Sequence, residues 1–213
     1  MNILLLGAPG CGKGTQSQYI SKEYGVTHIS TGDMLREICK QGTPEAVKIK
    51  RSIVSGELVS DDIVIELVKK RLRQIDYKNG LLLDGFPRTL YQVESLPDLG
   101  VEIDHVIELH VPDEVIVKRV GGRRVHPKSG RTYHILHKPP IDEGKDDITG
   151  EPLVLREDDT EYTVKMRLAE YHQQTTPIVT YYKNEAEESR VNYHRLDGTQ
   201  TVDTVSNQIF EIF

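Results

Sequence analysis

Short apolar runs alternate along this chain with longer segments in which apolar residues recur at helical spacing. Ile3–Leu6 and Leu81–Leu83 are apolar at every position, which is typical of parallel strands that are covered on both faces. Further strands are predicted at about 28–30, 106–111 and 191–196. Strands that alternate with helices predict an α/β fold built on a parallel sheet.

The predicted helices begin and end at residues that suit their termini. Pro44 fits the first turn of a helix that Gly56 can end, and Asp61-Asp62 place negative charge at the start of the next helix. The segment from Glu161 to Lys183 is predicted to be one long helix. The other helices are expected at about 13–24, from 31 onward, at 113–121 and at 202–213.

Residues 122–159 differ from the rest of the chain. They are rich in proline, glycine and charged residues and contain few large apolar side chains, so they cannot form a core element. A stretch of this length inside a compact domain is usually functional or disordered. Since basic residues flank it and aromatic and β-branched residues run through it, we interpret it as a small mobile lid.

The segment Gly7–Thr15 reads G-A-P-G-C-G-K-G-T and directly follows the apolar run Ile3–Leu6. A strand, a glycine-rich turn and a helix start in this order predict a phosphate-binding loop, in which backbone N–H groups and the helix dipole face an anion. Lys13 would reach the terminal phosphates. The general pattern has Ser or Thr directly after the lysine, whereas here Gly14 intervenes before Thr15.

Composition narrows the function classes. The chain has 213 residues and a net charge of -6, which disfavours a general nucleic-acid-binding or membrane-surface protein. Its two cysteines, Cys11 and Cys39, cannot form a disulfide framework or a four-cysteine metal site. The first apolar run is too short for a signal peptide, and no segment approaches a membrane span. We therefore expect a cytoplasmic protein.

Arginine is abundant at predicted loops and helix ends, where its planar guanidinium can bind phosphate oxygens in bidentate fashion. Arg88 is the most informative, because it follows the strand 81–83 within Asp84-Gly85-Phe86-Pro87-Arg88. Ligands of open α/β sheets bind beyond the carboxyl ends of the strands, where this segment is expected. Asp84 is a candidate to orient Mg²⁺ or its waters, or alternatively to cap the turn.

Several segments together resemble the adenylate kinase family in its long-lid bacterial form. The resemblance runs the length of the chain, and Asp-Gly-Phe-Pro-Arg is specific to nucleoside monophosphate kinases. The Gly14 departure is the form that this family uses. The matching segments are Gly7–Thr15, Ser30–Arg36, Leu83–Thr89, Gln92, Gly122–Arg124 and Asp197-Gly198.

The resemblance implies a P-loop kinase fold, with a five-stranded parallel sheet of strand order 2-3-1-4-5 flanked by helices. The core would comprise 1–29, 60–121 and 160–213, with a helical AMP-binding subdomain at 30–59 and the lid at 122–159. It implies the reversible Mg²⁺-dependent reaction of ATP with AMP to give two ADP. No general base is required, because the phosphate of AMP is already an anionic nucleophile. We expect a monomer, because closure would move both subdomains.

The resemblance also assigns candidate residues. Five cations would serve the transferring phosphoryl group: Lys13, Arg88, Arg123, Arg156 and Arg167. ATP would contact Gly10, Cys11, Gly12, Lys13, Gly14, Thr15, Arg119, Arg123, Thr132, Tyr133 and Gln200. AMP would contact Thr31, Arg36, Glu57, Leu58, Val59, Gly85, Arg88, Gln92, Arg156 and Arg167. Asp84 would hold Mg²⁺ through waters.

Some positions depart from the family pattern. Four lid positions that hold zinc-binding cysteines in some relatives are here His126, Ser129, Asp146 and Thr149. Serine and threonine are poor zinc ligands, so we expect a hydrogen-bonded network and no structural zinc. His137 stands where an aromatic residue is frequent, and Gln200 and Glu57 stand where lysine or another basic residue occurs in relatives.

Three other functions would explain part of the sequence. A UMP or CMP kinase would share the fold, but the long lid and Thr31 favour AMP. A nucleotide-dependent switch such as a GTPase lacks support, because the chain has no Asn-Lys-x-Asp motif and the Asp-Gly-Phe-Pro-Arg segment would be unexplained. A nucleic-acid-binding protein could use the basic residues 119–131, but the acidic balance and the missing aromatic platform disfavour it.

Overall fold

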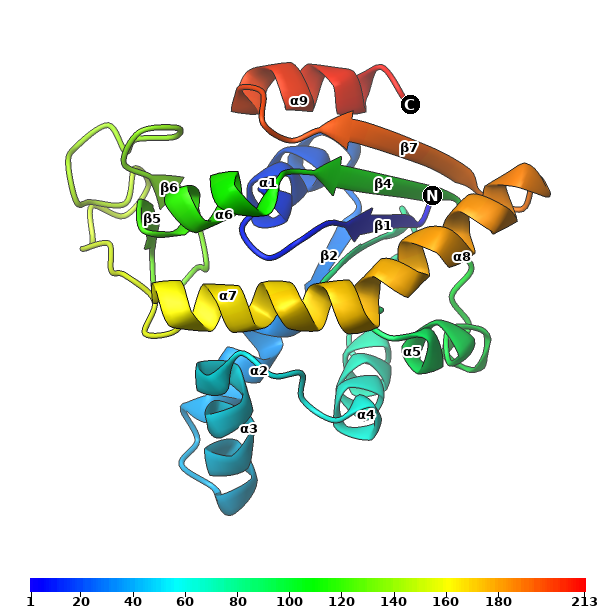
Figure 1. The fold of residues 1–213 in the computed structure, drawn as a ribbon, viewed down its shortest axis with the longest axis horizontal. Helices are drawn as coiled ribbons and strands as arrows, with labels where there is room; N and C mark the ends of the chain where they lie inside the picture. The colour runs from blue at the N-terminus through cyan, green and yellow to red at the C-terminus, as the bar shows by residue number, and fades with distance from the viewer.

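A five-stranded parallel sheet forms the centre of the computed structural model, which describes residues 1–213. Its strands are β1 (Ile3–Leu6), β2 (Thr27–Ser30), β3 (Leu81–Asp84), β4 (His105–His110) and β7 (Asn192–Asp197). They lie in the order β2-β3-β1-β4-β7, and every neighbouring pair is parallel. The fifth strand of the sheet is the seventh of the chain, so the predicted order 2-3-1-4-5 is confirmed (Figure 1).

Helices cover both faces of this sheet. The helices of the chain are α1 (Lys13–Tyr24), α2 (Thr31–Cys39), α3 (Pro44–Ser55), α4 (Asp61–Leu72), α5 (Leu90–Glu94), α6 (Asp113–Val120), α7 (Glu161–Glu170), α8 (Thr176–Glu187) and α9 (Val202–Phe210). The sequence predicted most of these, whereas the short α5 and a 3₁₀ turn at Pro97–Leu99 were not predicted. Helix α3 extends away from the sheet (Figure 1). No helix combines the length and apolar character that crossing a membrane requires.

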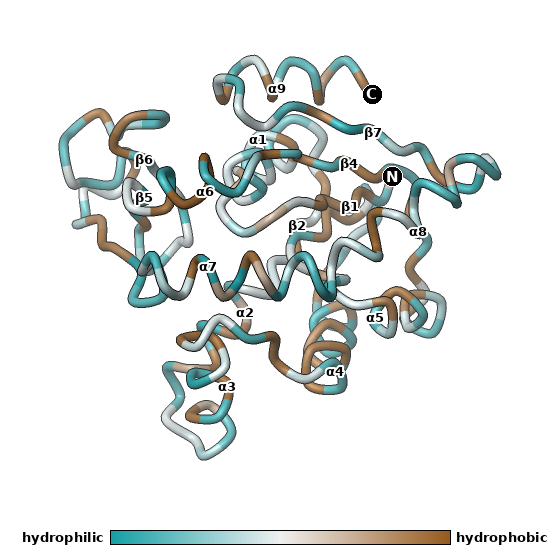
Figure 2. The backbone as a smooth tube through the Cα atoms, in the orientation of Figure 1, coloured by the Kyte–Doolittle hydropathy of each residue, from teal (hydrophilic) through white to brown (hydrophobic).

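Alternate residues of β1 belong to two separate cores. Leu4 and Leu6 pack with residues from α4, α5 and α8, whereas Ile3 and Leu5 pack with residues from α1, α6, α7 and α9. This alternation explains why the strand is apolar throughout, since each face of the sheet is buried. In Figure 2, helices α4 and α9 change between hydrophobic and hydrophilic stretches, as expected for helices with one face against a sheet.

The expected single helix over 161–183 is wrong in one respect. A π-helical turn at Tyr171–Thr175 separates α7 from α8, and the helical axis changes direction there (Figure 1). The sequence gives a partial reason, because Pro177 lies in the first turn of α8 and has no N–H to donate to a preceding carbonyl.

The segment 122–159 contains a small antiparallel pair, β5 (Arg123–Val125) and β6 (Thr132–His134). An isolated bridge also joins Val125 to Val154 near the end of the segment. Its interior is largely polar, and Ile141 and Ile148 are exposed. The segment is therefore an appendage held together by main-chain pairing and polar side chains. We call it the insertion 122–159.

Candidate functional site

One cleft of about 550 Å³ lies at the carboxyl ends of the strands, which is large enough for a small organic ligand. The loop after β1, the segment after β3, helix α2, the insertion 122–159 and helix α7 all contribute to its wall. Every residue that the sequence suggested as a nucleotide or Mg²⁺ contact lines this cleft. Segments that are far apart in the sequence therefore meet where ligands of α/β sheets bind.

The loop between β1 and α1 has the geometry of an anion cradle. Gly7, Gly10 and Gly12 have φ values of 143°, 88° and 111°, which side chains rarely permit. A Cβ on Gly7 would lie 2.6 Å from the Leu109 carbonyl oxygen, so glycine is also required by the close approach of β4. Helix α1 begins at Lys13, which directs its positive dipole end into the cleft.

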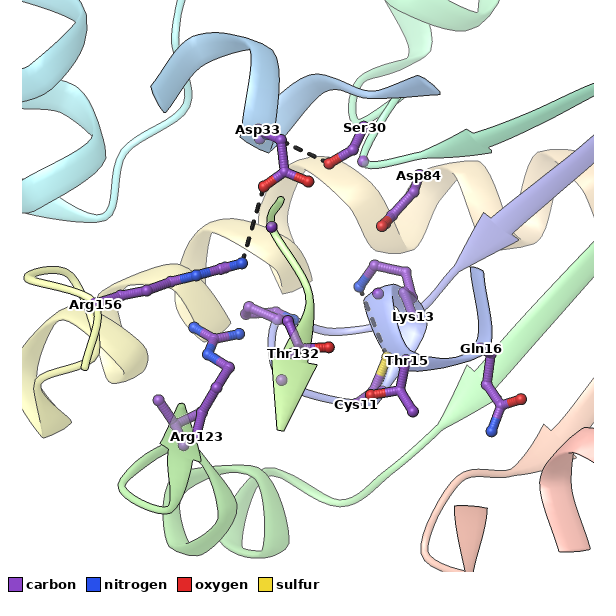
Figure 3. A pocket seen from close by; sticks show the side chains of 18 of the residues that line it. Cys11, Lys13, Thr15, Gln16, Ser30, Asp33, Asp84, Arg123, Thr132 and Arg156 are labelled. Carbon is purple, nitrogen blue, oxygen red and sulfur yellow. Dashed lines mark hydrogen bonds and ion pairs between the residues drawn. The ribbon is translucent and has the colours of Figure 1, made fainter. Parts of the chain in front are cut away.

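The Lys13 side chain lies over this loop. Its ammonium donates hydrogen bonds to the carbonyls of Gly7 at 2.6 Å and Ala8 at 3.0 Å, and it is 3.6 Å from the sulfur of Cys11 (Figure 3). The ammonium thus lies directly beside the cradle of backbone N–H groups. A phosphate bound there would meet both a fixed and a mobile source of positive charge.

Asp84 lies at the end of β3, next to the loop that carries Lys13 (Figure 3). Burial alone would raise the pKa of its carboxyl, but the nearby His28 imidazole and the cations Lys13 and Arg88 hold that pKa below its usual value. His28 Nε2 is 3.6 Å from the carboxylate. Asp84 is therefore ionised at neutral pH, as a Mg²⁺ ligand or an acceptor from Mg²⁺-bound water must be.

Four arginines converge on the cleft from different elements, and each has an acidic neighbour. Two are held by carboxylates next to each other in the chain. The ion pairs are Arg36–Asp33, Arg123–Asp159, Arg156–Asp33 and Arg167–Asp158. Figure 3 shows Arg123 and Arg156 pointing toward the loop that carries Lys13. The side chains of Asp158 and Asp159 are 6% and 1% exposed, so the arginines they hold have fixed orientations.

The clustered cations raise the electrostatic potential of this part of the cleft. Burial, reinforced by the positive charges of Arg36 and Arg123, lowers the pKa of Arg156 to about 10. Burial also lowers the pKa of Arg88, although Asp84 opposes the shift. Both guanidiniums remain charged at neutral pH. A bound polyanion would relieve their mutual repulsion, so this end of the cleft favours phosphate groups.

The part of the cleft wall that follows β3 is organised around the carbonyl of Gly85. It accepts hydrogen bonds from the Thr31 hydroxyl at 2.7 Å and from Arg88 Nε at 2.8 Å. Gln92, which is 2% exposed, accepts from the Arg88 N–H at 2.7 Å and donates to Asp61 at 2.6 Å. Gln92 thus holds the Arg88 segment in place, and its expected contact with AMP stays a prediction.

At the opposite end of the cleft, Arg119 crosses from α6 to the loop after β7. Its guanidinium donates to the carbonyls of Gly198 at 2.7 Å and Thr199 at 2.9 Å, which fixes the plane of the group. Gln200 lies in the same loop and also lines the cleft. This fixed plane is suited to stacking against an aromatic base, as expected for the donor adenine.

A comparison with protein-family models matches residues 5–187 to the model described as adenylate kinase. The match includes the loop after β1, the segment after β3 and all the arginines discussed above. The chain belongs to the adenylate kinase family. Members of this family are nucleoside monophosphate kinases, so the chain is a phosphotransferase that binds nucleotides.

In this member of the adenylate kinase family, the insertion 122–159 is built around the buried carboxylate of Asp146. Arg131 donates two hydrogen bonds to it, at 2.7 and 2.6 Å, and the hydroxyls of Tyr133 and Thr149 donate at 2.9 and 2.8 Å. His126 bonds to Ser129 and to a glutamate, each at 2.7 Å. The expected hydrogen-bonded network is therefore present, with Arg131, Tyr133 and Glu151 as members that were not expected.

Two expected ATP contacts lie beside this network. Tyr133 is 5% exposed and its hydroxyl is fully engaged, because it donates to Asp146 and accepts from the Asp147 N–H at 3.0 Å. Its contact with a nucleotide would therefore involve the ring or main chain. Thr132 lines the cleft and its hydroxyl has no hydrogen-bond partner. Both contacts stay predictions.

Sequence reasoning missed the acidic residues of this adenylate kinase site. Asp33, Asp158 and Asp159 pair with the arginines of the cleft, whereas the residues expected from the sequence were mainly cations that could touch phosphate. A usable signal was present, because Asp158-Asp159 closely follow Arg156 at the end of a segment rich in arginine. Buried guanidiniums need carboxylate or carbonyl partners, so an arginine-rich site predicts acidic residues behind it.

Proposed function

We propose that this chain is an adenylate kinase in the strict sense, catalysing the reversible conversion of ATP and AMP to two ADP. The observation that supports this most is that Lys13, Arg123 and Arg156 line one cleft together with Arg119 and Thr31, which come from elements on opposite sides of the phosphate loop. One end has the fixed plane of Arg119, and the other has the Thr31 hydroxyl. Such an arrangement suits phosphoryl transfer between two nucleotides, with the phosphates in the middle.

The proposed chemistry is alignment and charge stabilisation. The phosphate loop and Lys13 hold the donor's terminal phosphates, and Arg36 and Arg88 hold the phosphate of the acceptor. Arg123, Arg156 and Arg167 stabilise the charge on the transferring group, which spreads over its oxygens in the transition state. The AMP phosphate attacks as an anion, so no side chain has to remove a proton from it.

The residues beside the phosphate loop are suited to binding Mg²⁺. It prefers few protein carboxylates and retains several waters, and Asp84 supplies one ionised carboxylate beside the phosphate loop. When bound, Mg²⁺ would neutralise charge on the donor phosphates. For zinc, the Ser129 and Thr149 hydroxyls are poor ligands, so we propose that the insertion 122–159 needs no metal. Stoichiometric zinc that survives chelation would overturn that part.

We also propose that residues 122–159 act as a lid and residues 30–59 as the acceptor-binding subdomain, with the remainder as a core. Arg156 in the insertion lies 3.9 Å from Asp33 in α2, so these two parts approach each other across the cleft. Closure would exclude water, which otherwise accepts the phosphoryl group, and would assemble the arginines only around both nucleotides. A monomer leaves both parts free to move.

A phosphoryl-transfer assay with MgATP and AMP, CMP, UMP or GMP tests the proposal. Rapid formation of ADP with AMP, and slow reaction with the other three, is the expected result. Preference for CMP or UMP would keep the phosphotransferase chemistry but overturn the assignment of Thr31 and the acceptor pocket. ATP hydrolysis that is independent of any acceptor would overturn the proposal as a whole.

A further inference from the structure

The π-helical turn at Tyr171–Thr175 separates α7, which lines the cleft, from α8. A π turn inserts one extra residue into the helical repeat and is frequent at functional sites. Here it buries the side chain of Thr175, which is 6% exposed, while Thr176 is exposed. The turn follows α7, whose Arg167 lines the cleft.

The buried hydroxyl has a specific partner. Thr175 Oγ1 donates a hydrogen bond of 2.9 Å to the main-chain carbonyl of Arg88, across a sequence separation of 87 residues. Within the loop that joins β3 to α5, the Arg88 Nε donates to the Gly85 carbonyl, and the Arg88 N–H donates to the side chain of Gln92 in α5. Thr175 therefore anchors this loop from a remote element, and it does so on the residue whose guanidinium faces the cleft.

We propose that Thr175 is a positioning residue for the acceptor phosphate, acting through Arg88; this rests on the proposed role of Arg88 above. Helix α7 carries Arg167, and the π turn at its end holds the backbone of Arg88. One helical segment thereby sets the relative placement of two guanidiniums that approach the phosphates. Loss of the hydroxyl would leave the Arg88 carbonyl without its partner and let the loop shift. Small displacements of positioning groups carry large costs in rate.

The test compares Thr175→Val, which removes the hydroxyl while keeping the shape, with Thr175→Ser and Thr176→Val. Thr176 is a matched control, because its hydroxyl contacts the Tyr171 carbonyl in the same π turn at 3.4 Å and does not reach Arg88. Steady-state rates are measured with AMP and ATP varied separately. We expect Thr175→Val to lower kcat/KM for AMP about tenfold, equivalent to about 1.4 kcal/mol, with KM for ATP unchanged. Thr175→Ser restores the wild-type value, and Thr176→Val stays near it.

A purely structural role for Thr175 would give a different pattern. It would lower the melting temperature and the active fraction, so that the rates with both substrates fall together at unchanged KM for AMP; that result overturns the inference. If the valine variant does not fold, Thr175→Ala is measured in its place. Arg88→Lys, assayed in parallel, separates the two proposals. A large AMP defect in Arg88→Lys with a normal Thr175→Val overturns the inference alone, whereas normal AMP kinetics in both overturns the assignment of Arg88.

Discussion

Arg123 donates two hydrogen bonds to the carboxylate of Asp159, one of them at 2.7 Å from Nε. The carboxylate is almost fully buried, so the pair leaves the guanidinium of Arg123 little freedom to turn. The insertion 122–159 thus supplies both a cation for the cleft and the group that aims it. Substitutions of Asp159 should therefore affect catalysis, as substitutions of Arg123 should.

Replacing Arg123 by alanine should lower kcat by orders of magnitude and leave the fold intact. The reason is that its charge stabilises the transferring group in the transition state, where loss of one preorganised group typically costs about 10²–10³-fold. The measurement is kcat for ADP formation at saturating ATP and AMP, with circular dichroism as the check on folding. A turnover near that of the wild type would show that the role given to Arg123 is wrong.

Asp159→Asn should lower kcat by a smaller factor, about tenfold or more, because Arg123 remains but loses its bidentate partner. Glu157→Gln is the matched control, two residues away. Glu157 is 79% exposed and pairs with Lys50 on the surface, so its loss should leave kcat near wild type. Equal effects of the two substitutions on kcat would indicate that kcat depends on the total charge of this segment. They would contradict the proposal that Asp159 acts by orienting Arg123.

Thr31→Val should lower kcat/KM for AMP about tenfold while leaving KM for ATP unchanged. Thr31 is 2% exposed and its hydroxyl donates to the Gly85 carbonyl, and a partner left unpaired in a buried site costs about 1–3 kcal/mol. Thr27→Val in β2, the strand that precedes Thr31, is the control, because its hydroxyl donates to the Asp76 carbonyl and Thr27 does not line the cleft. A loss of ATP binding in Thr31→Val would place Thr31 at the donor end and contradict the proposal.

Asp84→Asn should raise the Mg²⁺ concentration that gives half-maximal activity. The substitution keeps the shape of the side chain but removes the charge that Mg²⁺ and its waters favour. Titration of Mg²⁺ at fixed ATP and AMP measures this. An unchanged Mg²⁺ requirement would favour the alternative role of Asp84, in which it is a structural partner of His28 and the turn that follows β3.

The strands and most helix boundaries could be predicted because apolar runs and terminal residues determine them locally. The strand order itself came from the family resemblance, since parallel pairing leaves no trace in periodicity. The cleft residues were predictable from motifs that carry phosphate chemistry. By contrast, the π turn at Tyr171–Thr175 depends on how α7 and α8 pack on the sheet. The sequence pattern of the segment is helical on both sides of the turn, so it predicts one continuous helix. The pairing of Asp159 with Arg123 likewise depends on tertiary structure.

The Asp146 network in the insertion 122–159 predicts a pH-dependent contribution to stability. Hydrogen bonds from Arg131, Thr149 and Tyr133, with Arg131 the largest influence, lower the pKa of Asp146 far below its usual value. A carboxyl whose pKa is lower in the folded state stabilises that state above its unfolded pKa of about 3.9. The contribution is lost as the pH falls toward the folded-state pKa.

Asp146→Asn should therefore destabilise the protein at neutral pH, and the difference from wild type should stay constant down to about pH 4 and shrink below it. Urea unfolding at pH 7, 5, 4 and 3.5 measures the difference, and hydrogen exchange of amides in 122–159 locates it. Asp142→Asn is the control, because Asp142 is 75% exposed and lies 4.0 Å from Lys145 in a surface pair. A difference that is independent of pH would mean that Asp146 contributes through its shape and hydrogen bonds, without its charge.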